Sequence, residues 1–134
     1  MTLYLDSSAL LKLYVEEPES ESCERLMNAD PIWLTARHTE IEVRRNLARL
    51  LQGRALTSAR DQFTSDWRRT HVLELDATTC GLAADLAEVT GARTLDALHL
   101  AAAQRAGGGA VPLLTYDLRQ AQVARSLGWT VLGV

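Results

Sequence analysis

The segment TLYLDSSALLKLYV, residues 2–15, decides the fold class, because it joins a short apolar run to a helical pattern. The apolar run is typical of a strand that is buried on both faces, and Asp6 follows it directly. Ser7 or Ser8 is placed to cap a helix over residues 8–15. A buried strand followed at once by a helix predicts the first unit of an α/β fold.

The same unit recurs along the rest of the chain. Buried strands that alternate with helices are typical of a parallel sheet covered on both faces. We therefore predict a single domain over residues 1–134, with a three-layer α/β/α architecture and a central parallel sheet of about five strands. The expected strands cover residues 2–6, 32–35, 71–75, 111–117 and 129–134, and the expected helices cover residues 8–15, 19–29, 37–53, 57–70, 76–91, 94–109 and 117–128.

Helix ends are expected where capping residues occur. Gly53 is predicted to end the third helix, Thr57 or Ser58 to cap the fourth, and Thr94 to cap the sixth. The third helix is expected to bury one apolar face. That face comprises Val43, Leu47, Leu50 and Leu51.

Composition narrows the class of protein. The chain has 134 residues, of which 47% are hydrophobic and 23% charged, so it can bury a core and is not intrinsically disordered. No apolar run reaches the roughly 18 residues of a membrane span. Two cysteines without CxxC spacing exclude a disulfide framework, and the first residues lack the basic region of a signal peptide. We expect a soluble, cytoplasmic protein that does not associate with membranes.

Charge is unevenly distributed. The net charge of −3 argues against a protein that coats nucleic acid without specificity. Residues 31–71, however, hold eight arginines against four acids. The planar guanidinium fork suits phosphate or carboxylate, although an arginine-rich helix face that only meets solvent fits the pattern equally well.

Acidic residues follow the ends of predicted strands or open predicted helices. Asp6, Asp76 and Asp117 follow strands, whereas Glu42 and Asp96 lie in early turns of helices. Because parallel sheets bind ligands at the carboxyl ends of their strands, we expect Asp6, Glu42, Asp96 and Asp117 to meet at one edge of the sheet.

Each of these four acids also has a structural explanation. Asp117 is placed to cap a helix, Asp6 to form an Asx turn, Asp96 to complement the helix dipole, and Glu42 to pair with Arg45. Four carboxylates brought together would nevertheless repel one another unless a cation lay between them. Oxygen ligands suit Mg²⁺ or Mn²⁺, which would orient a water molecule and shield charge on a scissile phosphate.

Other chemistries fit the sequence less well. The chain has neither a GxxxxGK[ST] nor a GxGxxG phosphate loop, no HExxH spacing and no GxSxG elbow. His99 is expected to be a packed or hydrogen-bonded helix residue rather than a metal ligand. A phospho-acceptor receiver domain would need a lysine after the last strands, but the single lysine of this chain is Lys12.

Four segments, taken in order, resemble the PIN domain family, and specifically the VapC-type toxin ribonucleases of bacterial toxin–antitoxin pairs. The acids that the resemblance assigns to the family's site are Asp6, Glu42, Asp96 and Asp117. The matching segments are LDSSALLKLYVEE (residues 5–17), TARHTEIEVRRNLARL (35–50), TLDALHLAAA (94–103) and LLTYDLRQAQVARSLGWTV (113–131).

The resemblance implies a Mg²⁺-dependent endoribonuclease, with Mn²⁺ as a substitute, that cleaves tRNA, rRNA or mRNA. It implies a homodimer within a larger toxin–antitoxin assembly, inhibited by a cognate VapB-like antitoxin. Asp6, Asp96 and Asp117 would hold the metal, and Glu42 would complete the acidic ring and orient the attacking water.

The resemblance also implies roles around the acids. Ser8 and Thr115 are expected to fix the carboxylates, whereas Arg45 and Arg49 would contact substrate phosphates or the carboxylates of an antitoxin.

Glu40 is a competing candidate for the second acid. On a helix it points about 200° away from Glu42, so only one of the two can face the site. Because Val43 and Leu47 are expected to face the core, the pattern favours Glu42.

Two other functions compete with that of a ribonuclease. One is a PIN-like fold that only binds RNA or protein, which would be favoured if one of the four acids were missing. The other is a related flap-type DNA nuclease, which needs a long helical arch that 134 residues do not accommodate.

Overall fold

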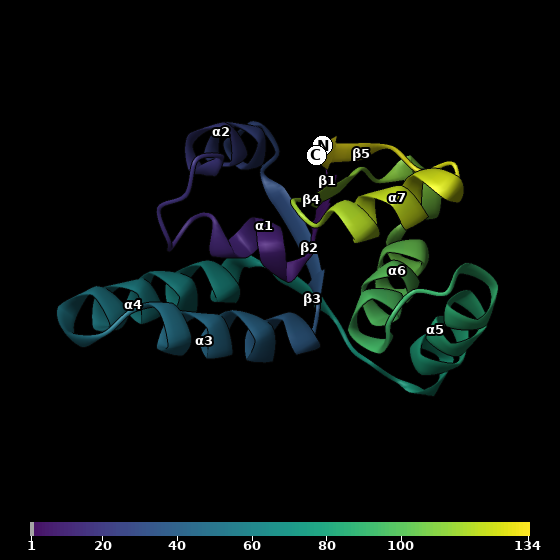
Figure 1. Cartoon of the computed structure of the whole chain (residues 1–134), viewed down its shortest axis with the longest axis horizontal. Coiled ribbons are helices and arrows are strands. Elements are labelled where there is room, and N and C mark those ends of the chain that lie inside the picture. Colours follow the sequence, from purple (N-terminus) through teal and green to yellow (C-terminus); the bar gives the residue numbers. More distant parts are fainter. Residues whose placement is uncertain (1) are drawn as a thin grey trace.

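A computed structural model describes residues 2–134 and shows a five-stranded sheet between layers of helices (Figure 1). The strands are β1 (Thr2–Leu5), β2 (Ile32–Ala36), β3 (His71–Leu73), β4 (Leu113–Thr115) and β5 (Val131–Gly133). The helices are α1 (Ser7–Leu11), α2 (Ser20–Ala29), α3 (His38–Leu50), α4 (Gly53–Arg69), α5 (Ala77–Thr90), α6 (Thr94–Ala106) and α7 (Leu118–Ser126), with a short 3₁₀ turn, η1 (Gly108–Ala110), before β4.

Strand β1 lies at the centre of the sheet. The strand order is β3-β2-β1-β4-β5, and all neighbouring strands are parallel. The chain builds the sheet outward from β1 to β3 and then returns to the other side of β1 with β4. This reversal between β1 and β4 is the position at which parallel sheets bind ligands.

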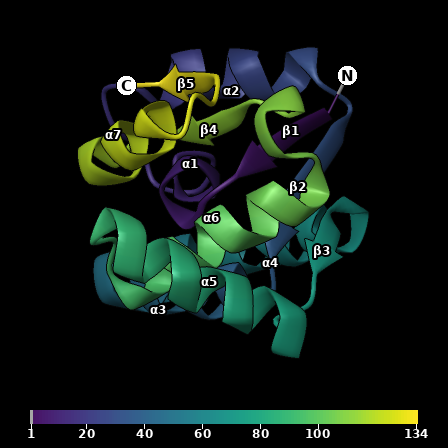
Figure 2. The same cartoon turned by 90° about the vertical axis from the view of Figure 1, so that its right-hand side faces the viewer.

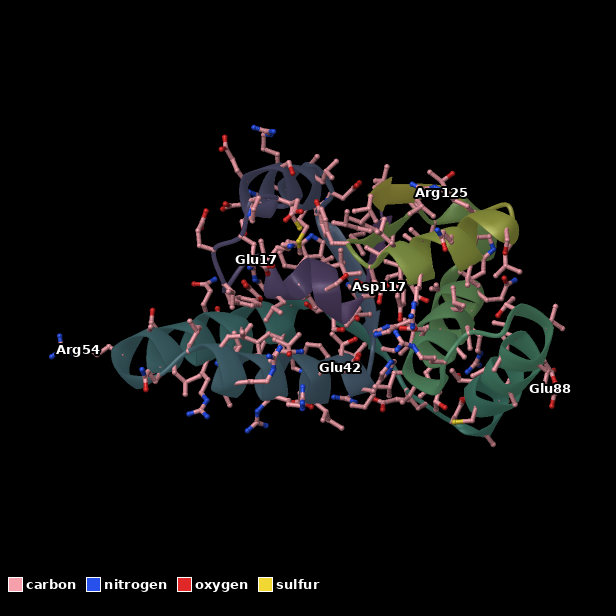
Figure 3. All side chains as sticks on the ribbon, viewed as in Figure 1. Glu17, Glu42, Arg54, Glu88, Asp117 and Arg125 are labelled. Carbon is pink, nitrogen blue, oxygen red and sulfur yellow. The ribbon has the colours of Figure 1, made fainter. Side chains whose placement is uncertain are left out.

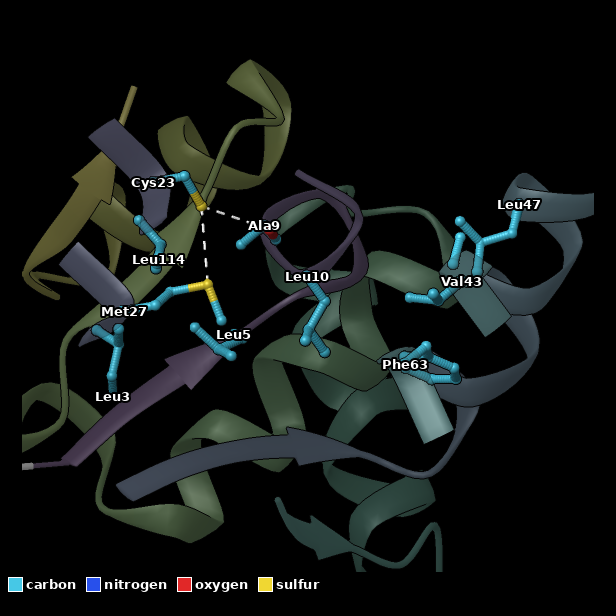
Figure 4. Close-up of a cluster of buried hydrophobic side chains, with 11 residues drawn as sticks. Leu3, Leu5, Ala9, Leu10, Cys23, Met27, Val43, Leu47, Phe63 and Leu114 are labelled. Carbon is cyan, nitrogen blue, oxygen red and sulfur yellow. Dashed lines mark hydrogen bonds between the residues drawn. The ribbon is translucent and has the colours of Figure 1, made fainter. Parts of the chain in front are cut away.

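The two faces of β1 contribute to separate cores. Leu3 and Leu5 pack into a cluster with residues of α1 to α4, which includes Cys23 and Met27 (Figure 4). Tyr4 points to the opposite face and packs with residues of α6 and α7. Figures 1 and 2 show α6 and α7 on the far side of the sheet from α1 to α4, with α5 outside α6. The predicted three-layer α/β/α fold is therefore confirmed.

The first helix begins and ends differently from the prediction. Asp6, rather than Ser7 or Ser8, is the N-cap of α1, because its carboxylate accepts a hydrogen bond from the backbone N–H of Ala9. The helix also ends at Leu11 instead of continuing to residue 15. The serines therefore lie inside the first turn, which leaves the Ser8 hydroxyl free to contact other groups.

Three further predictions of helix ends are wrong. Gly53 opens α4 instead of ending α3, so Thr57 and Ser58 lie inside α4 rather than capping it. Arg93, without a side-chain hydrogen bond, stands at the N-cap of α6, and Thr94 is the first helical residue. On α3, Val43 and Leu47 are fully buried, as predicted, but Leu50, the last residue of the helix, is 44% exposed.

Four of the five strands are shorter than predicted, whereas β2 is one residue longer and ends at Ala36. The third ends at Leu73, so Asp76 lies three residues beyond it and instead caps α5 through a bond from Thr79 N–H.

Within residues 2–134, no helix combines the length and the apolar character needed to cross a bilayer.

Candidate active site

Asp6 is a buried carboxylate at the carboxyl end of the central strand. It is only 4% exposed. Its Oδ1 accepts hydrogen bonds from the Ser8 hydroxyl at 2.6 Å and from Ala9 N–H at 3.2 Å, and its Oδ2 accepts one from the Thr115 hydroxyl. The end of β1, the first turn of α1 and the end of β4 thus fix this carboxylate together.

Thr115 and Ser8 join β4 to α1 across the switch point. The Thr115 hydroxyl, which donates to Asp6, accepts a hydrogen bond from the backbone N–H of Asp117 at 3.0 Å. The Ser8 hydroxyl accepts one from the backbone N–H of Tyr116 at 2.9 Å. These contacts place the residue after β4 beside Asp6.

Asp117 and Asp96 are joined through one buried side chain. Asp117 caps α7, where its Oδ1 accepts from the backbone N–H groups of Arg119 at 2.9 Å and Gln120 at 3.3 Å. The Gln120 amide in turn donates to the backbone carbonyl of Asp96 at 3.3 Å. Gln120 is 1% exposed, so this bond ties the start of α7 to the first turn of α6.

Burial and neighbouring charges shift the pKa values of the acids at this edge. Burial raises the pKa of Asp96, and the nearby carboxylates of Asp117 and Asp6 raise it further, whereas Arg93 lowers it. Burial also raises the pKa of Asp6, although the hydrogen bonds it accepts act in the opposite direction. A cation placed among these groups would relieve both effects.

Glu42 lies on α3 and faces two buried histidines. Its Oε1 is 2.8 Å from Nε2 of His99 and 3.6 Å from Nε2 of His38. The Nδ1 atom of His99 lies 3.0 Å from the hydroxyl of Tyr4, which is fully buried on β1. Figure 3 shows Glu42 and Asp117 in the middle of the molecule, with Arg54 and Glu88 at its two ends.

The histidines keep Glu42 ionised. Burial alone would raise the pKa of Glu42, but the hydrogen bond and charge of His99, together with His38, outweigh burial and lower it. Burial lowers the pKa of His38 to about 4, and His99 contributes in the same direction. Glu42 is therefore a fixed negative charge at neutral pH.

The structure separates Glu42 from Glu40. Glu40 lies 3.9 Å from the Arg37 guanidinium and lines surface depressions on the outer side of α3 and α4, whereas Glu42 reaches the histidines. This agrees with the predicted orientation of the two side chains. The alternative pairing of Glu42 with Arg45 is not among the ion pairs within residues 2–134.

Arg45 and Arg49 lie farther from the acids. Arg45 lines an exposed depression with Ile41 and Arg60. Arg49 donates to the Asn46 side chain at 3.0 Å, and that side chain donates to the Glu42 carbonyl at 2.9 Å. Among residues 2–134 neither arginine forms an ion pair with an acid, so both guanidinium groups can contact an anion from outside.

A cavity of about 270 Å³ opens beside Asp96, between the start of α6 and helix α7. Arg93 approaches the Asp96 carboxylate to 3.8 Å at its rim. The cavity thus presents the positive charge of Arg93 beside the negative charge of Asp96. Besides Asp96, its lining includes Arg93, Arg119, Gln120, Gln122 and Val123.

Comparison with known proteins assigns the family. The family model described as "PIN domain" matches residues 3–126. Ribonuclease VapC46 of Mycobacterium tuberculosis is 38% identical over 134 residues, which covers 97% of this chain and 95% of that protein. The chain belongs to the PIN domain family. Ribonuclease VapC35 of the same species is 34% identical to this PIN domain, with the same coverage of 97% and 95%.

Solved structures share the fold of this PIN domain at low sequence identity. FitAcB from Neisseria gonorrhoeae has a TM-score of 0.74 at 17% identity and covers 99% of this chain and 97% of its own. The sarcin–ricin loop cleaving toxin VapC20 of Mycobacterium tuberculosis has a TM-score of 0.69 at 19% identity, covering 90% and 93%. VapBC2 from Rickettsia felis, bound to a promoter DNA fragment, reaches 0.69 at 14% identity, covering 98% and 97%.

The donor groups of this PIN domain suit two kinds of cation differently. Asp6, Asp96 and Asp117 supply only oxygen atoms, and burial raises the pKa values of Asp6 and Asp96, so a cation would stabilise their ionised forms; these residues fit Mg²⁺. His38, Glu42 and His99 form a separate group whose ligand atoms lie within 4.8 Å of one another. Imidazole-rich groups suit transition metals better than Mg²⁺.

Sequence reasoning did not foresee that His38 and His99 both face Glu42. His99 was expected to be packed or hydrogen-bonded, which agrees with its contacts, but its partner could not be named. A signal was present, because His38 precedes Glu42 by four residues on one helix face and His99 follows Asp96 by three residues on another.

Proposed function

We propose that this PIN domain is the toxin of a type II toxin–antitoxin pair, a Mg²⁺-dependent endoribonuclease that a cognate antitoxin inhibits. The observation that carries the proposal is the convergence of Asp6, Asp96 and Asp117 at the carboxyl end of β1 and β4. Hydrogen bonds through Thr115 and Gln120 link the three, burial raises the pKa values of Asp6 and Asp96, and the charges of Asp117 and Asp6 raise that of Asp96 further. The VapC relatives, which are named ribonucleases, support the reaction class.

The three aspartates would hold the metal. A Mg²⁺ ion bound there would supply positive charge for the scissile phosphate and for the oxygen that attacks it. Ser8 and Thr115 each donate a hydrogen bond to one oxygen of the Asp6 carboxylate. They would therefore hold this carboxylate in one orientation for the metal. Manganese, which accepts the same oxygen ligands, would substitute.

Glu42 would orient the attacking water. Its carboxylate is ionised, held by His99 and partly exposed, so that it accepts a hydrogen bond from a water molecule on the open side. A lowered pKa makes it a weak proton acceptor, which favours an orienting role over that of a general base. Arg45 and Arg49 would contact RNA phosphates or antitoxin carboxylates from the α3 surface.

Partner proteins follow from the same assignment. Several structures of similar fold are toxin–antitoxin complexes, including one from Klebsiella pneumoniae and VapBC from Salmonella typhimurium. We expect this chain to form a homodimer and to join a cognate antitoxin in a larger assembly. Its substrate would be tRNA, rRNA or mRNA.

Cleavage of labelled tRNA and rRNA by the purified protein tests the proposal. Discrete fragments are expected with Mg²⁺ or Mn²⁺, and none with EDTA or in Asp96→Asn, because the variant removes a metal-holding oxygen. Asp85→Asn, the same substitution at an exposed position on α5, is the matched control and should cleave like the wild type.

A module that only binds RNA or protein is the alternative function. It would give no fragments from any RNA and no saturable stabilisation by Mn²⁺. Fragments that persist unchanged in Asp96→Asn would contradict the assignment of the acids.

A further inference from the structure

Both histidine contacts of Glu42 are made to the same carboxylate oxygen. His99 and His38 approach Oε1 at 2.8 Å and 3.6 Å. His99 is 2% exposed and His38 is 5% exposed, so neither ring can change position without disturbing the core. The contacts thus fix one oxygen of Glu42 through two buried rings, while the Glu42 side chain remains 20% exposed.

The hydrogen bonds that join Glu42, His99 and Tyr4 have defined donors and acceptors. An ionised carboxylate only accepts, so His99 Nε2 carries the proton and donates it to Glu42. In the neutral ring Nδ1 is then an acceptor, and its neighbour at 3.0 Å is the Tyr4 hydroxyl, which donates. The Glu42 carboxylate thereby selects the Nε2–H tautomer of His99, and the Tyr4 hydroxyl on the central strand supplies the matching partner for Nδ1.

His38 holds the ring of His99 from the other side. The two ring centroids are 4.1 Å apart, with the planes tilted by 42°. The Nε2 of His38 lies 3.1 Å from the Leu95 carbonyl and donates to it, because a carbonyl oxygen can only accept. Since the Nε2 protons of both histidines are committed to oxygen acceptors, these rings are arranged to donate hydrogen bonds rather than to ligate a metal.

We infer that His99 is a positioning residue for the nuclease: hydrogen-bonded to Tyr4 and packed against His38, it donates to Oε1 of Glu42 and so fixes this carboxylate toward the acidic site. The inference rests on the proposed function of Glu42. It extends that function into the second layer of side chains and connects the central strand to the attacking water.

Two substitutions of His99 separate its hydrogen bond from its bulk. A Gln side chain places its amide N–H near the position of Nε2, whereas an Asn side chain reaches only the position of Nδ1. We expect His99→Asn to lower kcat for the RNA cleaved by the wild type by about 10- to 100-fold, the usual effect of losing such an outer contact. KM should change little, and His99→Gln should recover most of kcat.

A structural control distinguishes positioning from loss of stability. Leu98→Ala on the same helix removes a partly buried side chain that packs against the α5 side of α6, so it should lower the melting temperature but keep kcat well below that temperature. Equal kcat in His99→Asn and wild type, or equal losses in His99→Asn and His99→Gln, would overturn the inference.

Nitrogen-15 NMR of the histidine rings tests the hydrogen-bond chain without any cleavage. The wild type should show His99 as the Nε2–H tautomer, with a change in the Nδ1 signal in Tyr4→Phe. A Nδ1–H tautomer would overturn the inference even if the protein cleaves RNA. Absence of cleavage with the expected tautomer would instead count against the proposed function alone.

Discussion

His38 shows how a single buried side chain can make stability depend on pH. It is 5% exposed, it donates to the Leu95 carbonyl, and its Nδ1 has no hydrogen-bond partner within residues 2–134. Burial and the neighbouring His99 ring lower its pKa to about 4, below the ordinary value of 6.5. The folded chain therefore binds this proton less readily than the unfolded chain does.

We predict that the His38 contribution to stability is complete above pH 6.5 and is lost as the pH falls from 6.5 toward 4. In that interval the unfolded state binds the proton and the folded state does not, which costs up to about 1.4 kcal/mol per pH unit. Urea unfolding of the wild type and His38→Gln between pH 4.5 and 7.5 measures the effect. The variant should have the flatter pH profile, and parallel profiles would refute the prediction.

At the scale of residues, the sequence predicts the orientation of Glu42 but not the residues that contact it. Glu42 could be preferred over Glu40 because helical geometry and the apolar positions of Val43 and Leu47 fix the orientation of α3. The contact between His99 and Glu42 joins residues 57 positions apart, and the periodicity of a sequence does not predict contacts between distant residues. It depends on how α6 crosses the end of β1 and meets α3.

Helix α5 has one glycine in its interior and another at its C-cap. The two differ in backbone conformation, but both have open space where a Cβ would lie. Neither Gly81 nor Gly91 has a heavy atom within 4 Å of the position that a Cβ would occupy. Gly81 lies inside the helix, whereas Gly91 is the left-handed C-cap with φ of +75°.

We predict opposite effects of the same substitution at these two glycines. Gly81→Ala should raise the free energy of unfolding by about 0.5–1 kcal/mol, because alanine favours the helix and restricts the unfolded chain. Gly91→Ala should lower it by about 1–2 kcal/mol, because a Cβ is disfavoured in the left-handed region. Chemical denaturation of both variants provides the measurement, and a shift of the same sign in both would contradict the argument.

At the scale of elements, the alternation of apolar runs and helical patterns predicts every strand and helix, but not their ends. Ser7 and Ser8 were plausible caps, yet Asp6 takes the role because its carboxylate also meets Thr115 from a strand distant in sequence. Tertiary contacts of this kind decide between neighbouring candidates that local preferences rank as equal.

On the proposed function, metal binding would be a property of the assembled molecule, because its oxygen ligands would come from the N-caps of α1 and α7 and the first turn of α6. We predict that Mn²⁺ stabilises the wild type saturably, by about 2.7 kcal/mol at one hundred times its Kd. Asp6→Asn should abolish this stabilisation. Its melting temperature without metal should equal or exceed that of the wild type, because an ionised carboxylate no longer has to be buried.

Thermal melts at increasing Mn²⁺, with EDTA as the baseline, measure both effects. A metal-dependent rise in Asp6→Asn as large as in the wild type would remove Asp6 from the site. A large fall in its melting temperature without metal would show that the hydrogen bonds from Ser8 and Thr115 outweigh the cost of burying the charge.

At the scale of the whole molecule, the strand order could not be read from periodicity. Apolar runs indicate that the strands are buried, but they do not show that β4 returns to lie beside β1 rather than beyond β3. The strand order becomes visible only in the structure. It also decides the location of the site, because the acids converge where the order reverses.

The hydrogen bond between Thr115 and Asp6 joins residues 109 positions apart in the chain. A protein leaves the ribosome with its N-terminus first, so Asp6, Glu42 and Asp96 emerge before β4 and α7. On the proposed function, a growing chain carries an incomplete set of acids and is harmless to the RNA around it until synthesis has passed Asp117.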